Sequence, residues 1–234
     1  MNLRLLTFFT LVIGMMLGTS MFAQGTVYTI LGGLTMSTQT VNGFEKDPFF
    51  RFHGMAVMES SSDISPNSLY GSLGYHVKGS AVNSPAYHDP VQGIDQERHS
   101  SSIEFHNLSL GTGVKQRREV GPNFLSYGLG VRLDFNLKTD YSSLFAGLEG
   151  SENKLTYGLD LTVGFEFPMS ELVSTTVEFA FSPDLKEQIY IPYQDTGYNY
   201  DDGTPVIIQE SYITNVILEA RVGFRFWRKV IYTD

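Results

Sequence analysis

The chain has 234 residues, with 25 acidic against 16 basic side chains and a formal net charge of −9. This acidic balance argues against nucleic acid as a partner. The chain has no cysteine, which excludes disulfides, thiolate metal sites and a lipid-attachment cysteine.

The first residues have the pattern of an export signal. Arg4 is the only charge among them, residues 5–17 are apolar, and the small Ala23 precedes a plausible cleavage point. The apolar run is short for a membrane span, although a retained anchor is the alternative. We expect a signal peptide at residues 1–23 and one exported domain at residues 24–234.

Alternating apolar and polar residues predict β-strands in the rest of the chain, because successive strand side chains point to opposite faces. Residues 125–138 alternate without a mistake, with apolar side chains at every odd position. No competing helical pattern follows the signal. The eight predicted strands cover residues 26–38, 49–59, 68–80, 102–114, 125–138, 154–167, 172–182 and 212–226.

One predicted strand changes its pattern midway. In residues 102–114 the apolar set slips from odd positions (Ile103, Phe105) to even positions (Leu108, Leu110). Since a one-residue shift moves side chains to the other face, an extra residue in a bulge near His106 would explain the slip.

The connections sort into two kinds. Those after the second, fourth and sixth predicted strands are short, including residues 115–122, and those after the third, fifth and seventh are longer. Residues 183–210 form the longest connection. An even strand count with short turns at one rim and long loops at the other is the plan of an outer-membrane barrel. The predicted fold is an all-β, eight-stranded antiparallel up-and-down transmembrane β-barrel.

Three observations indicate that the apolar face looks outward. Aromatic residues such as Tyr127 and Phe135 bound an aliphatic stretch, as at the two interfaces of a membrane. Glycines such as Gly128 and Gly130 sit on the polar face, where a narrow lumen needs room. The strands are also longer than the usual five or six residues. We expect an apolar outside, facing lipid, and a polar inside.

The inward positions carry charges of both signs, which predicts a paired, filled lumen. We expect Arg132, Asp160, Glu178 and Arg221 to form a belt at one height, with Asp160 opposite or diagonal to Glu178. The predicted lumen charge network comprises Arg132, Asp134, Asp160, Glu178, Glu219, Arg221 and Arg225.

With the strands "YGLGVRLDF" and "YGLDLTVGFEF" and the closing "LEARVGFRFWRK", the chain resembles the PorT-like outer-membrane β-barrel proteins of Bacteroidota-type bacteria. The resemblance covers residues 24–229 and rests on a diffuse pattern. It implies a small outer-membrane barrel of a Gram-negative bacterium. Most members of the family have no assigned activity, and some serve in type IX secretion. It offers no catalytic motif to carry over.

The sequence lacks the spacings of two enzymatic sites that small barrels can carry. A lipid-A deacylase-like site needs a His-x-Ser spacing on the lipid-facing wall, which none of the histidines has; these are His53, His76, His88, His99 and His106. An omptin-like protease needs a histidine and acidic pairs at the outer rim. The nearest counterparts, residues 88–89 and 201–202, lie on different predicted loops. We therefore expect no catalytic residue and no enzyme.

Metal and cofactor sites are also not expected. Residues 195–203 place acidic oxygens near glycines, but without the spacing of a calcium loop. His53, His76 and His106 can all project into the lumen, where histidines usually form hydrogen bonds rather than bind metal.

The sequence therefore predicts a non-catalytic integral outer-membrane protein with a structural, surface-interaction or secretion-accessory role. Its expected partners are outer-membrane lipid and other proteins, bound through extracellular loops or periplasmic turns. A small porin and a secreted lipocalin-like barrel with an apolar ligand are the alternatives.

Overall fold

The computed structural model describes residues 25–40, 48–61, 66–84, 87–89, 94–96, 99–198, 205–208 and 210–229. The predicted signal peptide and residues 199–203 of the candidate calcium loop lie outside the described residues. Within the described part, no helix is long and apolar enough to cross a membrane.

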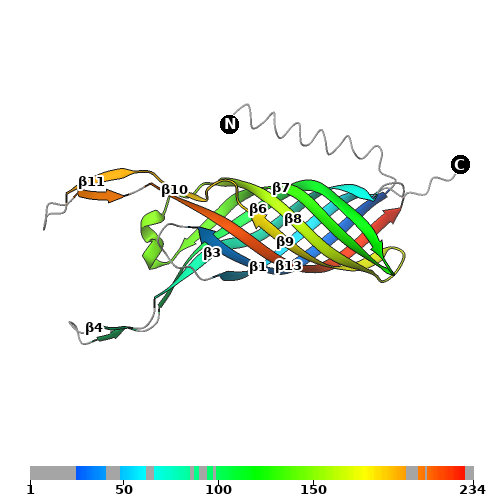
Figure 1. The fold of residues 1–234 in the computed structure, drawn as a ribbon, viewed down its shortest axis with the longest axis horizontal. Coiled ribbons are helices and arrows are strands. Elements are labelled where there is room, and N and C mark those ends of the chain that lie inside the picture. Colours follow the sequence, from blue (N-terminus) through cyan, green and yellow to red (C-terminus); the bar gives the residue numbers. More distant parts are fainter. Residues whose placement is uncertain are drawn as a thin grey trace, which may run out of the picture.

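Eight strands of the described chain form one closed antiparallel ring (Figure 1). Each strand pairs with the next along the chain, and β13 pairs with β1 to complete the circle. This confirms the predicted fold class. The ring consists of β1 (Gly25–Thr40), β2 (Phe49–Ser61), β3 (Asn67–Ser84), β6 (His99–Val120), β7 (Asn123–Tyr141), β8 (Leu155–Pro168), β9 (Val173–Pro183) and β13 (Ser211–Lys229).

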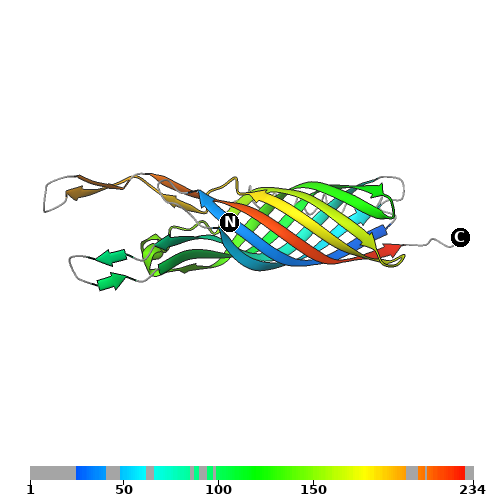
Figure 2. The same cartoon turned by 60° about the horizontal axis from the view of Figure 1, so that its bottom comes forward.

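The two rims differ as the connection lengths predicted. At the turn rim, β6 and β7 are joined by Gly121 and Pro122, and Gly121 has a φ of 63°, which favours glycine. At the loop rim, two small hairpins project beyond the ring (Figure 2). The elements of the loop rim, which the sequence did not predict, are β4 (Tyr87–Asp89), β5 (Ile94–Gln96), the 3₁₀ turn η1 (Ser143–Leu148), β10 (Ile189–Ile191), β11 (Gln194–Tyr198) and β12 (Pro205–Ile208).

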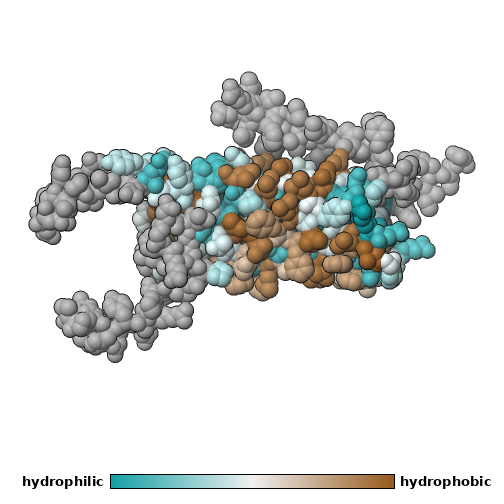
Figure 3. Space-filling model, viewed as in Figure 1, coloured by the Kyte–Doolittle hydropathy of each residue, from teal (hydrophilic) through white to brown (hydrophobic). Residues whose placement is uncertain are grey.

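The outer wall is apolar and the inner wall is polar. In β8, Leu161, Val163 and Phe165 are exposed, whereas Thr162, Gly164 and Glu166, which follow them in turn, are buried. An apolar band covers the middle of the barrel surface, with polar residues toward its ends (Figure 3). The predicted direction of the apolar face is therefore confirmed.

The end of β6 corrects one prediction. The sequence assigned residues 115–122 to a turn, but β6 continues to Val120 and stays paired with β7. Lys115 and Arg117 consequently belong to the wall of the barrel, with their side chains on the inward side of the strand.

A bulge is present near His106, as predicted, but the extra residue lies on β7 and not on β6. The β6–β7 register shifts between His106 and Asn107, and the extra residue is Leu137 on β7. Within β6 the odd positions stay inward, so Ile103 and Phe105 are buried inside the barrel. Their apolar character reflects an apolar cluster at the loop rim, not a change of face.

The ladder between β2 and β3 stops early and leaves a fork in the wall. It runs from the pair Glu59–Tyr70 to the pair Gly54–Tyr75, whereas β3 is paired with β6 along its whole length. From Gly54 and Tyr75 toward the loop rim, β2 and β3 are not paired. We call this place the β2–β3 fork.

Between the fork and the loop rim, side-chain hydrogen bonds replace the missing backbone pairing of β2 with β3. The Ser37 hydroxyl of β1 donates to the carbonyl of Gly79 at 2.7 Å and accepts from its N–H at 2.9 Å. Arg51 of β2 reaches past β3 to form two hydrogen bonds, of 2.6 and 3.2 Å, with Glu104 of β6. Val77 and Gly79 occupy outward positions of β3 and are nevertheless buried. The upper part of β3 is thus covered by protein on both faces.

Candidate functional site

Asp134 of β7 is the junction of the ion-pair network in the loop half of the lumen. Its carboxylate accepts hydrogen bonds from Lys78 Nζ at 2.8 Å, Arg132 Nε at 2.9 Å and Ser109 Oγ at 2.5 Å. Asp184 accepts from the same two cations, at 2.8 Å from Lys78 and 2.7 Å from Arg132. Two buried cations and two buried carboxylates therefore compensate one another.

A second group of charges surrounds Arg221 of β13. Its guanidinium donates to Glu178 Oε1 at 2.8 Å and to Glu219, and one nitrogen lies 3.6 Å from Asp160 Oδ1. Lys115 Nζ donates to the other oxygen of Glu178 at 2.8 Å. These side chains are all buried.

His76 connects the two groups. Its Nε2 lies 3.5 Å from Asp134 Oδ1, and its Nδ1 lies 3.4 Å from Glu219 Oε1. The charges of the loop half thus form one continuous network rather than separate pairs.

The predicted belt is present in part. Arg221 contacts both Glu178 and Asp160, but the prediction that Arg132 joins them is wrong, since Arg132 binds the carboxylates of the Asp134 group. The sequence pattern identified inward positions and could not give the stagger between strands, which sets the height of each residue in a barrel.

The predicted neighbourhood of Asp160 and Glu178 is also wrong. The β8–β9 ladder places Gly164 opposite Glu178. Asp160 instead accepts a hydrogen bond of 2.5 Å from Ser182 of β9. The two carboxylates are therefore separated along the strand, and Arg221 spans the distance between them.

A third group of charges lies in the turn half of the lumen. Glu166 accepts two hydrogen bonds of 2.9 Å from Arg117 and lies 3.3 Å from Arg225 Nη1. Arg225 also lies 3.2 Å from Glu59. Both guanidinium groups lie near the ring of Trp227. Two cations again face two carboxylates.

A small apolar cluster lies next to this group in the lumen. Leu31, Val57 and Tyr70 are buried together inside the barrel. Gly113 and Gly130 make room for the Tyr70 ring, because a Cβ at either position would collide with it. This is the inner-wall role that the sequence assigned to Gly130.

The loop rim is closed by a second apolar cluster. Its buried members come from β6, β10 and β13, and η1 packs against them. The cluster consists of Ile103, Phe105, Ile189 and Ile213, with Tyr141, Phe145, Leu148 and Ile191 around it.

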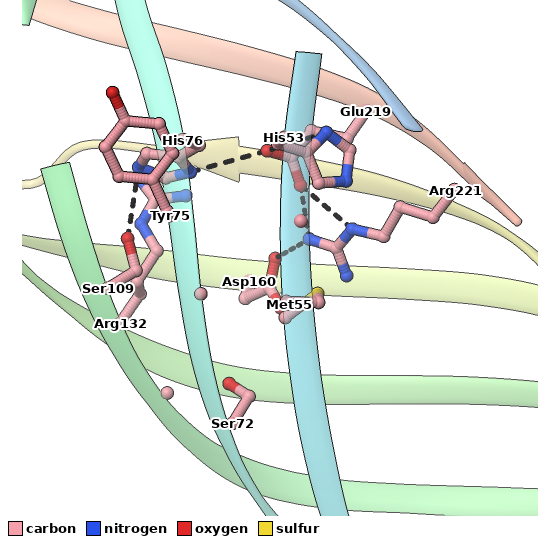
Figure 4. A pocket seen from close by; sticks show the side chains of 13 residues that line it. His53, Met55, Ser72, Tyr75, His76, Ser109, Arg132, Asp160, Glu219 and Arg221 are labelled. Atoms are coloured by element: carbon pink, nitrogen blue, oxygen red, sulfur yellow. Dashed lines mark hydrogen bonds and ion pairs between the residues drawn. The ribbon is translucent and has the colours of Figure 1, made fainter. Parts of the chain in front are cut away.

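A small cavity lies beside the Arg221 group, behind the β2–β3 fork (Figure 4). It offers about 30 Å³ of space, enough for roughly two water molecules. Its lining includes His53 and Gly54 of β2, Tyr75 and His76 of β3, and Arg221. The fork and the charge network therefore meet at this cavity.

His106 does not face the lumen, unlike His53 and His76. It lies on the outer wall, where Nδ1 is 2.6 Å from the Tyr75 hydroxyl and Nε2 is 3.1 Å from Asp140. The Lys138 ammonium donates a hydrogen bond of 2.9 Å to the same carboxylate. In the described part of the chain, no three His, Asp or Glu side chains are grouped so as to hold a metal ion.

All seven residues of the predicted lumen network lie buried in the barrel. Five further charged residues belong to the same groups and were not in it: Glu59, Lys78, Lys115, Arg117 and Asp184. Lys115 and Arg117 occupy odd positions like Ser109, and odd positions of this strand point inward. A longer predicted strand would therefore have included both in the lumen network. Asp184 follows the even positions of β9 into a loop, where alternation is no guide.

Fold and interior together define an eight-stranded up-and-down β-barrel with an apolar exterior and a lumen filled by paired charges. No protein-family model and no curated protein sequence matches the chain. The expected membership of the PorT-like family therefore remains a prediction.

Solved outer-membrane barrels have a similar course of the chain. OprG from Pseudomonas aeruginosa aligns with a TM-score of 0.48 and 10% identity, over 89% of this chain and 98% of its own. Ail of Yersinia pestis aligns at 0.41 and 15%, over 87% and 99%. The protease OmpT from Escherichia coli aligns at 0.45 and 9%, over 88% and 98%. At these values the likeness carries no argument, and the fold assignment rests on the strand ladders.

Proposed function

We propose that this chain is an integral protein of a bacterial outer membrane, without catalytic activity, whose barrel serves as a rigid membrane scaffold. The observation that carries the proposal is the apolar outer wall around a charged interior. Apolar side chains are exposed on this wall, including Leu129, Val131, Leu161 and Val222. Their exposure to water would cost free energy, whereas contact with lipid would not. The pairing of β13 with β1 also closes the sheet, so that no strand of the ring is an edge strand along its whole length, and the backbone pairing of β2 with β3 is missing only above the fork.

The compensated interior supports a structural role. The buried charges that we describe bind one another, so few are left to act on a substrate. Interaction with other proteins is then assigned to the loop rim, where the hairpins project. A secretion-accessory role of the PorT-like kind is the finer form of this proposal, and it rests on the sequence resemblance.

The filled lumen disfavours the two alternatives. A porin needs an open aqueous path, but here buried ion pairs and two buried apolar clusters occupy the interior. A lipocalin-like barrel needs an apolar cavity for its ligand, whereas the cavity is lined by charged side chains.

The location can be tested by fractionation of cells that express the full chain. The mature protein should stay in outer membranes washed with high salt and with alkali, and should run faster on a gel before boiling than after. Release into the wash would overturn the membrane assignment. Planar-bilayer recordings of the purified protein should give no steady conductance, and a steady open channel would favour the porin.

A further inference from the structure

We propose that His76 of β3 carries a proton in the folded barrel and forms a pH-sensitive switch at the β2–β3 fork. At neutral pH the charged ring holds β3 in the lumen network, and loss of the proton at higher pH loosens the fork. Three observations carry the proposal: the charge balance of the lumen, the contacts of both ring nitrogens, and the place of His76 at the end of the β2–β3 ladder.

The ion-pair network in the loop half of the lumen has one carboxylate more than it has Lys and Arg cations. Among the described residues its cations are Lys78, Lys115, Arg132 and Arg221, and its carboxylates are Asp134, Asp160, Glu178, Asp184 and Glu219, all buried. The group in the turn half, in contrast, sets two cations against two carboxylates. Because a buried charge without compensation is costly, the loop-half network should bind one further positive charge.

His76 is placed to supply this charge, because both of its ring nitrogens face carboxylates. Nδ1 lies 3.4 Å from Glu219 Oε1 (Figure 4), and Nε2 lies 3.5 Å from Asp134 Oδ1. Each carboxylate also binds a Lys or Arg side chain, which keeps it ionised and able only to accept hydrogen bonds. A neutral imidazole would point a lone pair at one of them. An imidazolium donates from both nitrogens, so the contacts favour the protonated ring.

The other histidine in contact with the network, His53 of β2, is less suited to carry the proton. Its Nδ1 lies 3.9 Å from Glu219 Oε1, and its buried Nε2 has no hydrogen-bond partner among the described residues. Protonation of His53 would therefore leave an N–H donor that nothing accepts.

The polar groups that act on His76 come from four neighbouring strands. They are Asp134 and Arg132 of β7, Glu219 of β13, Ser109 of β6 and His53 of β2. Arg132 is the cation that opposes a proton on His76, but it is itself bound to Asp134 and Asp184. Its charge is thus already compensated, and the two carboxylates that contact the ring favour the proton.

His76 lies where β3 stops pairing with β2. The last pair of that ladder is Gly54–Tyr75, so His76 is the first residue of β3 beyond it. The next inward residue, Lys78, binds Asp134 and Asp184. The part of β3 that β2 does not pair is therefore attached to the lumen by two consecutive inward cations. Without its proton, His76 no longer attracts both carboxylates, and the network keeps an excess negative charge.

The direction of the pH effect follows from counting protons. An ordinary histidine, such as His76 in the unfolded chain, loses its proton near about pH 6.5. At neutral pH the folded barrel then binds one proton more than the unfolded chain, so its stability falls as the pH rises.

Histidine ring NMR of the folded full-length protein in detergent tests the protonation directly. At about pH 7.5, nitrogen-15 spectra should show an imidazolium ring that is lost in His76→Gln and persists in His53→Gln. A neutral His76 ring in the wild-type spectrum would overturn the proposal, whether or not the variants fold.

Amide hydrogen exchange tests the switch. The Gly79 N–H lies on the part of β3 beyond the ladder, and its protection factor should fall at least tenfold between about pH 7 and about pH 9.5. Glu219→Gln removes the surplus carboxylate with little change in shape. The network then balances without a proton on His76, and the fall should shrink to less than about twofold.

Glu171→Gln is the matched control, because it removes the same charge from the exposed turn between β8 and β9. It should keep the tenfold fall. A wild-type protection factor that does not change with pH, or an unaltered fall in Glu219→Gln, would overturn the switch. Both readouts concern the folded barrel in detergent, so they are independent of the membrane assignment.

Discussion

The regular wall formed by β6, β7, β8 and β9 and the β2–β3 fork are built from strands of the same alternating pattern, yet different bonds hold them. In the regular wall, backbone hydrogen bonds join the strands almost throughout. The β6–β7 ladder passes through the bulge at Leu137, and beyond the Leu161–Phe181 pair the N–H groups of Leu185 and Lys186 bind the carbonyl of Tyr157. At the fork the ladder stops at Gly54–Tyr75, and Ser37, Arg51 and buried lumen charges connect the strands instead. A barrel can therefore open its backbone ladder locally where side chains satisfy the freed groups.

The largest effect is expected where the lumen network reaches β3. Asp134→Ala should cost about 3–5 kcal/mol of unfolding free energy, because it strands the buried Lys78 and Arg132 cations. Urea midpoints in detergent measure this loss. Asp140→Ala is the control: its partner Lys138 is exposed, and the loss should be below about 1 kcal/mol. Equal losses would mean that the network does not hold the fork region.

The regular wall should be most sensitive on its outer face. Leu161→Arg places a basic residue among exposed apolar side chains, at a cost of about 2–4 kcal/mol if they contact lipid. Folding into vesicles, followed by the gel shift before boiling, measures it. Thr162→Val, one residue along, should change stability little, since the buried Thr162 hydroxyl has no partner. Normal assembly of Leu161→Arg would argue that this wall does not face lipid.

The fork itself should depend on one hydroxyl. Ser37→Ala leaves the buried N–H and carbonyl of Gly79 without their partner and should cost about 1–3 kcal/mol. Amide hydrogen exchange of Gly79 should rise in the same variant. Ser60→Ala, at an exposed hydrogen bond to Leu69, serves as the control with a smaller loss. Unchanged exchange at Gly79 would show that another group holds β3 in place.

The smallest expected effect is a coupling energy, which distinguishes the observed Arg221–Glu178 pair from the predicted belt. A double-mutant cycle between Arg221 and Glu178 should give a coupling of about 0.5–3 kcal/mol, since they share a hydrogen bond of 2.8 Å. The cycle between Arg132 and Asp160 should be more nearly additive, because Arg132 binds other carboxylates. A larger coupling in the second cycle would restore the predicted belt.

Alternation along the sequence predicted the inward and outward faces, because the period of a strand is a local property. It placed Arg132 and Glu219 correctly in the lumen. It could not predict that Arg132 meets Asp184, since that contact depends on the stagger of β7 against a loop after β9. The fork was equally hidden, because alternation shows which face a residue takes and not where two neighbouring strands stop pairing.

Apolar residues at positions that break the alternation could not be interpreted from the sequence alone. Ile103 and Phe105 suggested a bulge within their own strand, whereas they are buried members of the loop-rim cluster. An apolar residue at an inward position has two explanations, a shifted face or a local core. Deciding between them requires the segments that cover it, here β10 and η1, which lie far along the chain.

The pairing of β1 with β13 has a kinetic consequence. The ladder joins Gly25 to Lys229 and Thr40 to Thr214, so the ring closes between its first and its last strand. Bringing ends about 200 residues apart together costs about 5 kcal/mol of chain entropy, plus a constant, before the first closing bond forms. Until β13 arrives, the sheet has two open edges, on β1 and β9, and open edges invite aggregation. The last strand therefore governs how long the unfinished barrel must be protected during assembly.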